Sequence, residues 1–175
     1  MPLCVDLDGT LIYSDLLRES FLRVLRAYPW RVLLVPWWFL HGRARLKREL
    51  AKGVVLDVAA LPYNEALLAW VRAEKARGRP VLLVTASDRD FARPVADHVG
   101  IFDEVMGSDG VTNLRGARKA AALVARFGER GFDYAGNSSP DLAVWAHARA
   151  AIVVNASPSL ARRARERFAV AAEFS

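Results

Sequence analysis

The stretch VDLDGTL, residues 5–11, decides the fold class of this chain. Two carboxylates, Asp6 and Asp8, stand two residues apart at the end of a short apolar run, residues 2–5. Open α/β sheets place their chemistry at the carboxyl ends of their strands, so both side chains are predicted to lie at such an end. One carboxylate could attack a substrate while the other moves a proton, and a hard cation could sit between them.

The composition predicts a folded chain of one domain, or of one domain with a small insertion. The chain has 175 residues, of which 53% are hydrophobic, and this excludes a disordered protein. The single cysteine, Cys4, lies in the first apolar run, so no internal disulfide can form and a buried strand position is expected. No basic signal-peptide region precedes the acidic pair, and we therefore expect a cytoplasmic location.

Short apolar runs alternate with helical stretches along most of the chain. Strands are predicted at 3–5, 80–84, 104–106, 132–135 and 151–154, and helices at 64–75, 89–99, 116–127 and 141–148. This alternation predicts an α/β fold with a parallel sheet and helices on both faces. Residues 13–77 interrupt the rhythm with mostly helical pattern, which indicates an insertion between the first and second strands.

An aromatic stretch and a basic cluster lie inside this interruption. Residues 28–42 hold three of the five tryptophans and are too few for a bilayer-spanning helix, which needs about 20 apolar residues. Both a packed helix and a segment at a membrane surface explain them. Arg43, Arg45 and Lys47 follow, either as a solvated helix face or as contacts to an anionic substrate. No nucleic-acid-binding motif is present, so no nucleic acid partner is expected.

Four elements, in chain order, resemble the motifs of the haloacid dehalogenase (HAD) superfamily, most of whose members are phosphatases. They are DLDGT at 6–10, a strand ending at Thr85, a helical lysine, and GNSSPD at 136–141 in place of the usual GDxxxD. Lys119 is preferred as that lysine, with Arg115 and Arg118 as competitors. Ser87 and Asp88 are interpreted as the start of the next helix, and Asp133 as a surface residue.

The resemblance implies a HAD-like Rossmannoid core, residues 1–12 and 78–175, with a helical cap at 13–77. It implies hydrolysis of phosphomonoesters with Mg²⁺ as cofactor, through an aspartyl-phosphate. In the family pattern Asp6 is the nucleophile and Asp8 the general acid and base. Thr10, Thr85 and Lys119 would bind the phosphoryl group, and the metal residues would be Asp6, Asp8, Asn137 and Asp141.

One position departs from the family pattern. Asn137 stands where the family has an acidic residue, and its amide oxygen can bind Mg²⁺ but brings no charge. The alternative function is therefore a catalytically weak module that binds a phosphorylated ligand.

Longer blocks resemble the HAD domain fused to UbiA-type membrane prenyltransferases. This implies a phosphorylated lipid or sugar phosphate as substrate, with a membrane surface or a UbiA-type domain as partner. The oligomeric state is not indicated.

Overall fold

A computed structural model describes residues 1–14, 57–109 and 112–175 of the chain. The aromatic stretch at 28–42 and the predicted substrate contacts Arg43, Arg45 and Lys47 lie outside the described residues. Most of the proposed cap, 13–77, also lies outside them, so the division into core and cap stays a prediction.

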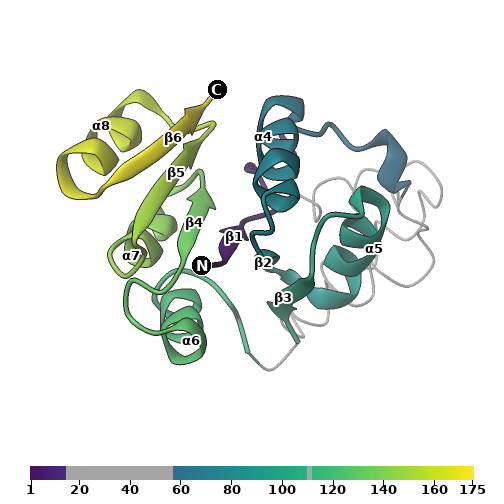
Figure 1. Ribbon diagram of the computed structural model, residues 1–175, viewed down its shortest axis with the longest axis horizontal. Coiled ribbons are helices and arrows are strands. Elements are labelled where there is room, and N and C mark those ends of the chain that lie inside the picture. Colours follow the sequence, from purple (N-terminus) through teal and green to yellow (C-terminus); the bar gives the residue numbers. More distant parts are fainter. Residues whose placement is uncertain (15–56, 110–111) are drawn as a thin grey trace, which may run out of the picture.

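One parallel sheet of six strands forms the centre of the described structure (Figure 1). Its strand order is β3-β2-β1-β4-β5-β6, with bounds β1 Leu3–Val5, β2 Val81–Asp88, β3 Glu104–Ser108, β4 Asp133–Gly136, β5 Ala150–Val154 and β6 Val170–Phe174. The chain builds outward from β1 first to one side and then to the other, so the order reverses between β1 and β4. In open α/β sheets the crevice at this point, beyond the carboxyl ends of the strands, is where ligands bind.

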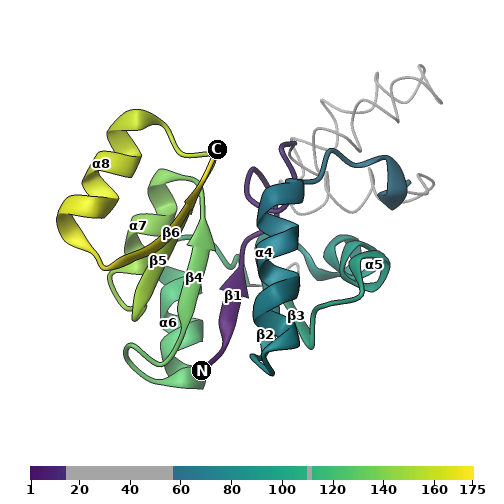
Figure 2. The same ribbon diagram turned by 45° about the horizontal axis from the view of Figure 1, so that its top comes forward.

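Helices cover both faces of this sheet, as the sequence pattern predicts (Figure 1 and Figure 2). They are α4 Glu65–Ala76, α5 Arg89–Val99, α6 Ala117–Phe127, α7 Leu142–Trp145 and α8 Pro158–Arg167, with short 3-10 turns η2 Val58–Ala60 and η3 Ser139–Asp141. α4 and α5 pack on one apolar cluster, and α6, α7 and α8 pack on the other. Adjacent β2 residues alternate between the two clusters, because successive side chains of a strand point to opposite faces.

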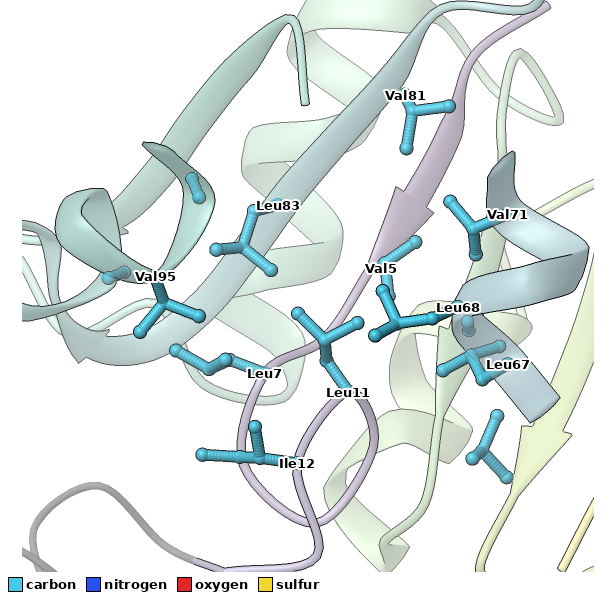
Figure 3. Close-up of a cluster of buried hydrophobic side chains, with 14 of the residues drawn as sticks. Val5, Leu7, Leu11, Ile12, Leu67, Leu68, Val71, Val81, Leu83 and Val95 are labelled. Carbon is cyan, nitrogen blue, oxygen red and sulfur yellow. The ribbon is translucent and has the colours of Figure 1, made fainter. Parts of the chain in front are cut away.

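The loop that follows β1 is anchored by its own apolar side chains. Leu7, Leu11 and Ile12 are all fully buried. Figure 3 shows them beside Leu83 of β2 and Val95 of α5. These buried apolar residues thus fix the turn. The polar residues of the same turn lie in the candidate site.

Several boundaries differ from the sequence-based prediction. β2 extends to Asp88, well past the predicted end at residue 84. The helix predicted at 141–148 is a 3-10 turn followed by the four-residue α7, with Pro140 within its first turn. β6 was not predicted, because its alanine-rich sequence at the sheet edge has weak strand propensity and only half-buried side chains.

The prediction that Asp133 lies at the surface is wrong. Its side chain is 1% exposed and accepts hydrogen bonds from Arg149 and Arg79. Burial alone would raise the pKa of Asp133, but these two guanidinium groups outweigh it and hold the pKa below its ordinary value. A carboxylate at the start of β4 is therefore buried because two arginines neutralise it.

Candidate active site

A tight turn carries Asp6 and Asp8 away from the carboxyl end of β1. Gly9 has a φ of +74°, a left-handed conformation that side chains disfavour. A Cβ atom at Gly9 would lie 2.1 Å from Asn137 Nδ2, so the glycine also allows Asn137 to close against the turn. The segment GNSSPD, residues 136–141, thus lies against the segment DLDGT, residues 6–10, at Gly9.

Lys119 is the cation that reaches Asp6. It lies in the first turns of α6, is 2% exposed, and donates from Nζ to Asp6 Oδ1 at 2.9 Å. The same Nζ donates to the Val84 carbonyl oxygen at 3.2 Å. The structure therefore selects Lys119 over its sequence competitors Arg115 and Arg118 as the partner of Asp6.

The Asp6 carboxylate is buried, with an exposed fraction of 8%. Burial raises the pKa of Asp6 to about 6, the neighbouring ammonium of Lys119 opposes this shift, and the Asp141 and Asp8 carboxylates add to it. Leu7 N also donates to Asp6 Oδ1, at 2.9 Å. Within the described residues both of these hydrogen bonds go to Oδ1 and neither goes to Oδ2.

Tyr134 connects the lysine to the fourth sequence element. This β4 residue is fully buried, accepts from Lys119 Nζ at 2.7 Å and donates to Asp141 Oδ1 at 3.0 Å. Burial, with the carboxylates of Asp6 and Asp141, raises the pKa of Tyr134 well above its ordinary value, so the phenol stays neutral. Sequence reasoning missed Tyr134, since a tyrosine within an apolar strand is typical of a core residue.

Asp141 holds the loop that carries Asn137. Its Oδ2 accepts from Asn137 N at 3.1 Å, from Ser138 N at 2.9 Å and from Ser138 Oγ at 2.8 Å. Both carboxylate oxygens therefore have protein donors, since Tyr134 occupies Oδ1. The direct contacts of Asp141 are with this loop and with Tyr134.

Two hydroxyls at the end of β2 lie near the Asp8 carboxylate. Ser87 Oγ donates to Asp8 Oδ2 at 2.6 Å, and Thr85 Oγ1 is 3.4 Å from the same oxygen. Asp88 caps α5 by accepting from Asp90 N at 3.0 Å, as predicted. Ser87, interpreted from the sequence as part of the helix start, instead points to Asp8, because β2 stays extended through this residue.

Thr10 takes a buried place in the turn. Its side chain is fully buried, and Oγ1 has no hydrogen-bond partner among the described residues. The amides of Leu7, Gly9 and Thr10 donate to Asp6 Oδ1, Ser14 O and Leu7 O. These three amides are therefore used within the turn and its continuation to Ser14. A phosphate contact by the Thr10 side chain stays a prediction.

Two asparagines brace the turn from other elements. Asn155, which follows β5 with a φ of +47°, donates from Nδ2 to the Gly9 carbonyl oxygen at 2.9 Å. Its Oδ1 accepts from Asn64 Nδ2 at 3.3 Å, and Asn64 also caps α4. Neither residue was predicted from the sequence. The signals available there were the end of a strand for Asn155 and the start of a helix for Asn64.

The oxygen donors around the turn fit a hard divalent cation. They are the Asp6 carboxylate and the side-chain amide of Asn137, which lies against Gly9, together with the main-chain carbonyl of Asp8 in the same turn, which the family resemblance implies as a ligand. Mg²⁺ prefers such oxygen ligands. In the part of the chain that the structure describes, no three His, Cys, Asp or Glu side chains gather as a metal site. These donors are all oxygen atoms, as Mg²⁺ prefers. They carry one negative charge fewer than the family pattern, because Asn137 is neutral.

Residues 3–146 match the family of haloacid dehalogenase-like hydrolases, and the chain therefore belongs to this family. It is 41% identical over 167 residues to the uncharacterized protein y4nM of Sinorhizobium fredii (strain NBRC 101917 / NGR234). This match covers 95% of the chain and 32% of y4nM, so the chain spans about a third of the length of that relative. The family predicted from the four sequence elements is thus confirmed.

Solved structures confirm the HAD-like fold. An apo phosphoserine phosphatase superposes with a TM-score of 0.64 at 14% identity, over 99% of this chain and 92% of that one. The cobalt-bound deoxy-D-mannose-octulosonate 8-phosphate phosphatase of Haemophilus influenzae gives a TM-score of 0.57 at 14% identity, over 99% and 77%. Identities this low support the fold alone. Among the described helices, none combines the length and apolarity that crossing a bilayer requires.

Proposed function

We propose that this protein is a Mg²⁺-dependent phosphomonoesterase that forms an aspartyl-phosphate on Asp6. The observation that carries the proposal is the buried pair of Asp6 and Lys119, with a second carboxylate, Asp8, two residues along the same turn. A carboxylate nucleophile needs a nearby cation to receive a phosphoryl group, and a proton donor for the leaving oxygen. The family is that of haloacid dehalogenase-like hydrolases, and the fold is shared with a phosphoserine phosphatase.

The reaction divides into two displacements at phosphorus. Asp6 Oδ2 attacks the phosphorus atom, the bond to the leaving oxygen breaks, and Asp8 gives that oxygen its proton. Asp8 then takes a proton from water, whose oxygen attacks the phosphorus, and the bond to Asp6 breaks to release inorganic phosphate. Lys119 and Thr85 hold the phosphoryl oxygens in both steps, Lys119 by charge and Thr85 by its hydroxyl.

Asp6, the Asp8 carbonyl and Asn137 would hold the Mg²⁺, with Asp141 in support through the loop that it fixes. The cation supplies positive charge that offsets the charge of the phosphoryl oxygens. Because Asn137 is neutral, we expect the protein to need more Mg²⁺ than a relative with aspartate at this position.

The function is tested by phosphate release from a panel of phosphomonoesters with Mg²⁺, comparing the wild type with Asp6→Asn. Asp97→Asn is the matched control, because Asp97 is an exposed residue of α5 and takes part in none of the site contacts described above. We expect turnover by the wild type and by Asp97→Asn, and none by Asp6→Asn. A wild type without turnover, or turnover that survives Asp6→Asn, would overturn the proposal.

A phosphorylated lipid or sugar phosphate is the proposed substrate class. The support comes from the sequence, in the tryptophan-rich stretch 28–42 and in Arg43, Arg45 and Lys47 beside it. The panel should therefore contain phosphoserine, a sugar phosphate and a polyprenyl phosphate in detergent. Higher kcat/KM for the polyprenyl phosphate, lowered by Arg43→Ala, would support the lipid class.

A second candidate is a weak or inactive module that binds a phosphorylated ligand beside a membrane enzyme of the UbiA type. Two observations favour it, namely the neutral Asn137 and the much greater length of y4nM. Calorimetric binding of inorganic phosphate without turnover would support this candidate. Flotation of the protein with liposomes of anionic lipid would test the membrane side, and protein that stays at the bottom of the gradient would count against it.

A further inference from the structure

Ser87 and Thr85 reach Asp8 from one strand. β2 runs past the end of β1 as far as Asp88, and the pairing of β2 with β3 shifts register between Val84 and Asp88. Residues two apart along a strand lie on the same face, so both hydroxyls point toward Asp8. The motif resemblance implies a role for Thr85, and Ser87 has none in the mechanism described above.

The two hydroxyls bind the same carboxylate oxygen with different strength. Ser87 Oγ lies 2.6 Å from Asp8 Oδ2, within the range of about 2.5–2.7 Å for a hydroxyl that donates to a carboxylate. Thr85 Oγ1 lies 3.4 Å away, which makes a weak contact at most. Thr85 Oγ1 also accepts from Ser87 N at 2.9 Å. Ser87 therefore fixes Asp8 directly and orients the hydroxyl of Thr85.

We propose that Ser87 is a positioning residue that keeps Asp8 in place for both proton transfers, an inference that rests on the proposed phosphatase function. A hydroxyl is both donor and acceptor. It can donate to Asp8 as a carboxylate and, after rotation about the Cβ–Oγ bond, accept from Asp8 as an acid. The contact can therefore persist when Asp8 protonates the leaving oxygen and when it takes a proton from water.

The effect of losing Ser87 on kcat/KM should therefore depend on the leaving group. p-Nitrophenolate leaves without a proton, whereas an alkoxide needs one, so the loss of Ser87 should impair attack on an alkyl phosphate far more. In Ser87→Ala we expect kcat/KM for an alkyl phosphate to fall roughly tenfold further than kcat/KM for p-nitrophenyl phosphate. With p-nitrophenyl phosphate, hydrolysis of the aspartyl-phosphate should become limiting and give a burst of nitrophenolate before a slow steady state.

Two further variants separate positioning from general damage to the fold. Ser87→Thr keeps the hydroxyl and should restore both the leaving-group dependence and the steady-state rate. Ser108→Ala removes a neighbouring hydroxyl that bonds the Ala86 carbonyl at 2.7 Å and the Leu114 amide at 3.1 Å. This control should lower the melting temperature without changing the leaving-group dependence. Where Ser87→Ala fails to fold, Ser87→Cys, which keeps a weak donor, carries the same comparison.

The outcomes distinguish the two levels of the proposal. Suppose that the wild type turns over both substrates and that Ser87→Ala has the same kcat/KM values, or kcat/KM values lowered equally for both substrates without a burst. The role of Ser87 is then overturned and the phosphatase function stands. If the wild type turns over neither substrate and takes up no phosphoryl group, the phosphatase function is overturned and the role of Ser87 falls with it. A selective loss on the alkyl phosphate, recovered in Ser87→Thr, supports the inference.

Discussion

The substitution Tyr134→Phe isolates the hydroxyl that joins Lys119 to Asp141. Within the described residues this hydroxyl makes both of its hydrogen bonds to charged groups, at 2.7 Å and 3.0 Å, in a fully buried position. The ring of phenylalanine fills the same volume, so the change removes the two bonds and leaves the packing of β4 in place.

The expected cost is about 2 kcal/mol in the free energy of unfolding. A hydrogen bond to a charged group contributes about 1.5–3 kcal/mol, and two are lost. The loss is partly offset because Lys119 keeps its bonds to Asp6 Oδ1 and to the Val84 carbonyl, and Asp141 keeps its donors on Oδ2. For a chain of this length, about 2 kcal/mol corresponds to a fall in melting temperature of roughly 4–8 °C.

Urea and thermal unfolding measure this cost, with Tyr63→Phe as the matched control. The Tyr63 hydroxyl makes one neutral bond, to the Val58 carbonyl at 2.8 Å in a partly buried place, and its loss should cost about 0.5–1 kcal/mol. The rate of phosphate release should also fall in Tyr134→Phe, since Lys119 is less firmly held on Asp6. A loss in Tyr134→Phe below about 0.5 kcal/mol, or equal to that of Tyr63→Phe, would show that the Tyr134 hydroxyl does not stabilise the two charged groups.

Three further outcomes follow from the described contacts. Asn137→Asp should lower the Mg²⁺ concentration for half-maximal activity roughly tenfold, because one negative charge is added beside the cation, and an unchanged requirement in a Mg²⁺ titration would contradict this. Asp133→Asn should cost about 2 kcal/mol of unfolding free energy at pH 7, because it removes charged hydrogen bonds from Arg149 and from the mostly buried Arg79, which keeps its ion pair with Glu74. The pKa of Asp133 is lowered on folding, so its contribution is present above about pH 4 and lost as the pH falls further; urea unfolding at pH 7 and pH 3 should show the difference between wild type and variant shrinking, and a constant difference would count against it. Gly136→Ala should destabilise the protein by about 1–3 kcal/mol in the same assay, because its Cβ would lie 2.8 Å from Asp141 Cγ, and a neutral effect would show that this loop can shift.

The features that the sequence predicted well are those with local signals. The apolar run before Asp6, the glycine after it and the strand–helix alternation are patterns of neighbouring residues, and they predicted five of the six strands. Lys119 could be chosen over two arginines because it opens a helix with an apolar face. The resemblance to the family motifs then indicated that these elements belong to one site.

The features that the sequence could not predict depend on contacts between distant residues. Ser87 and Asp8 are 79 positions apart, and a serine before a helix is more often a cap than a partner of a carboxylate. Tyr134 in an apolar strand is typical of the core, and only the structure shows its hydroxyl between two charges. Asp133 required knowledge of two arginines from other elements, 54 and 16 positions away.

The central claim is that Asp6 receives the phosphoryl group, and one measurement tests it directly. The wild type is mixed with a ³²P-labelled phosphomonoester that it hydrolyses and Mg²⁺, quenched in acid within the first turnover, digested and mapped by mass spectrometry. We expect label on the peptide that contains Asp6, at the Asp6 side chain, and no label in Asp6→Asn. Label on another residue, or product formation with no labelled protein at any time, would contradict it.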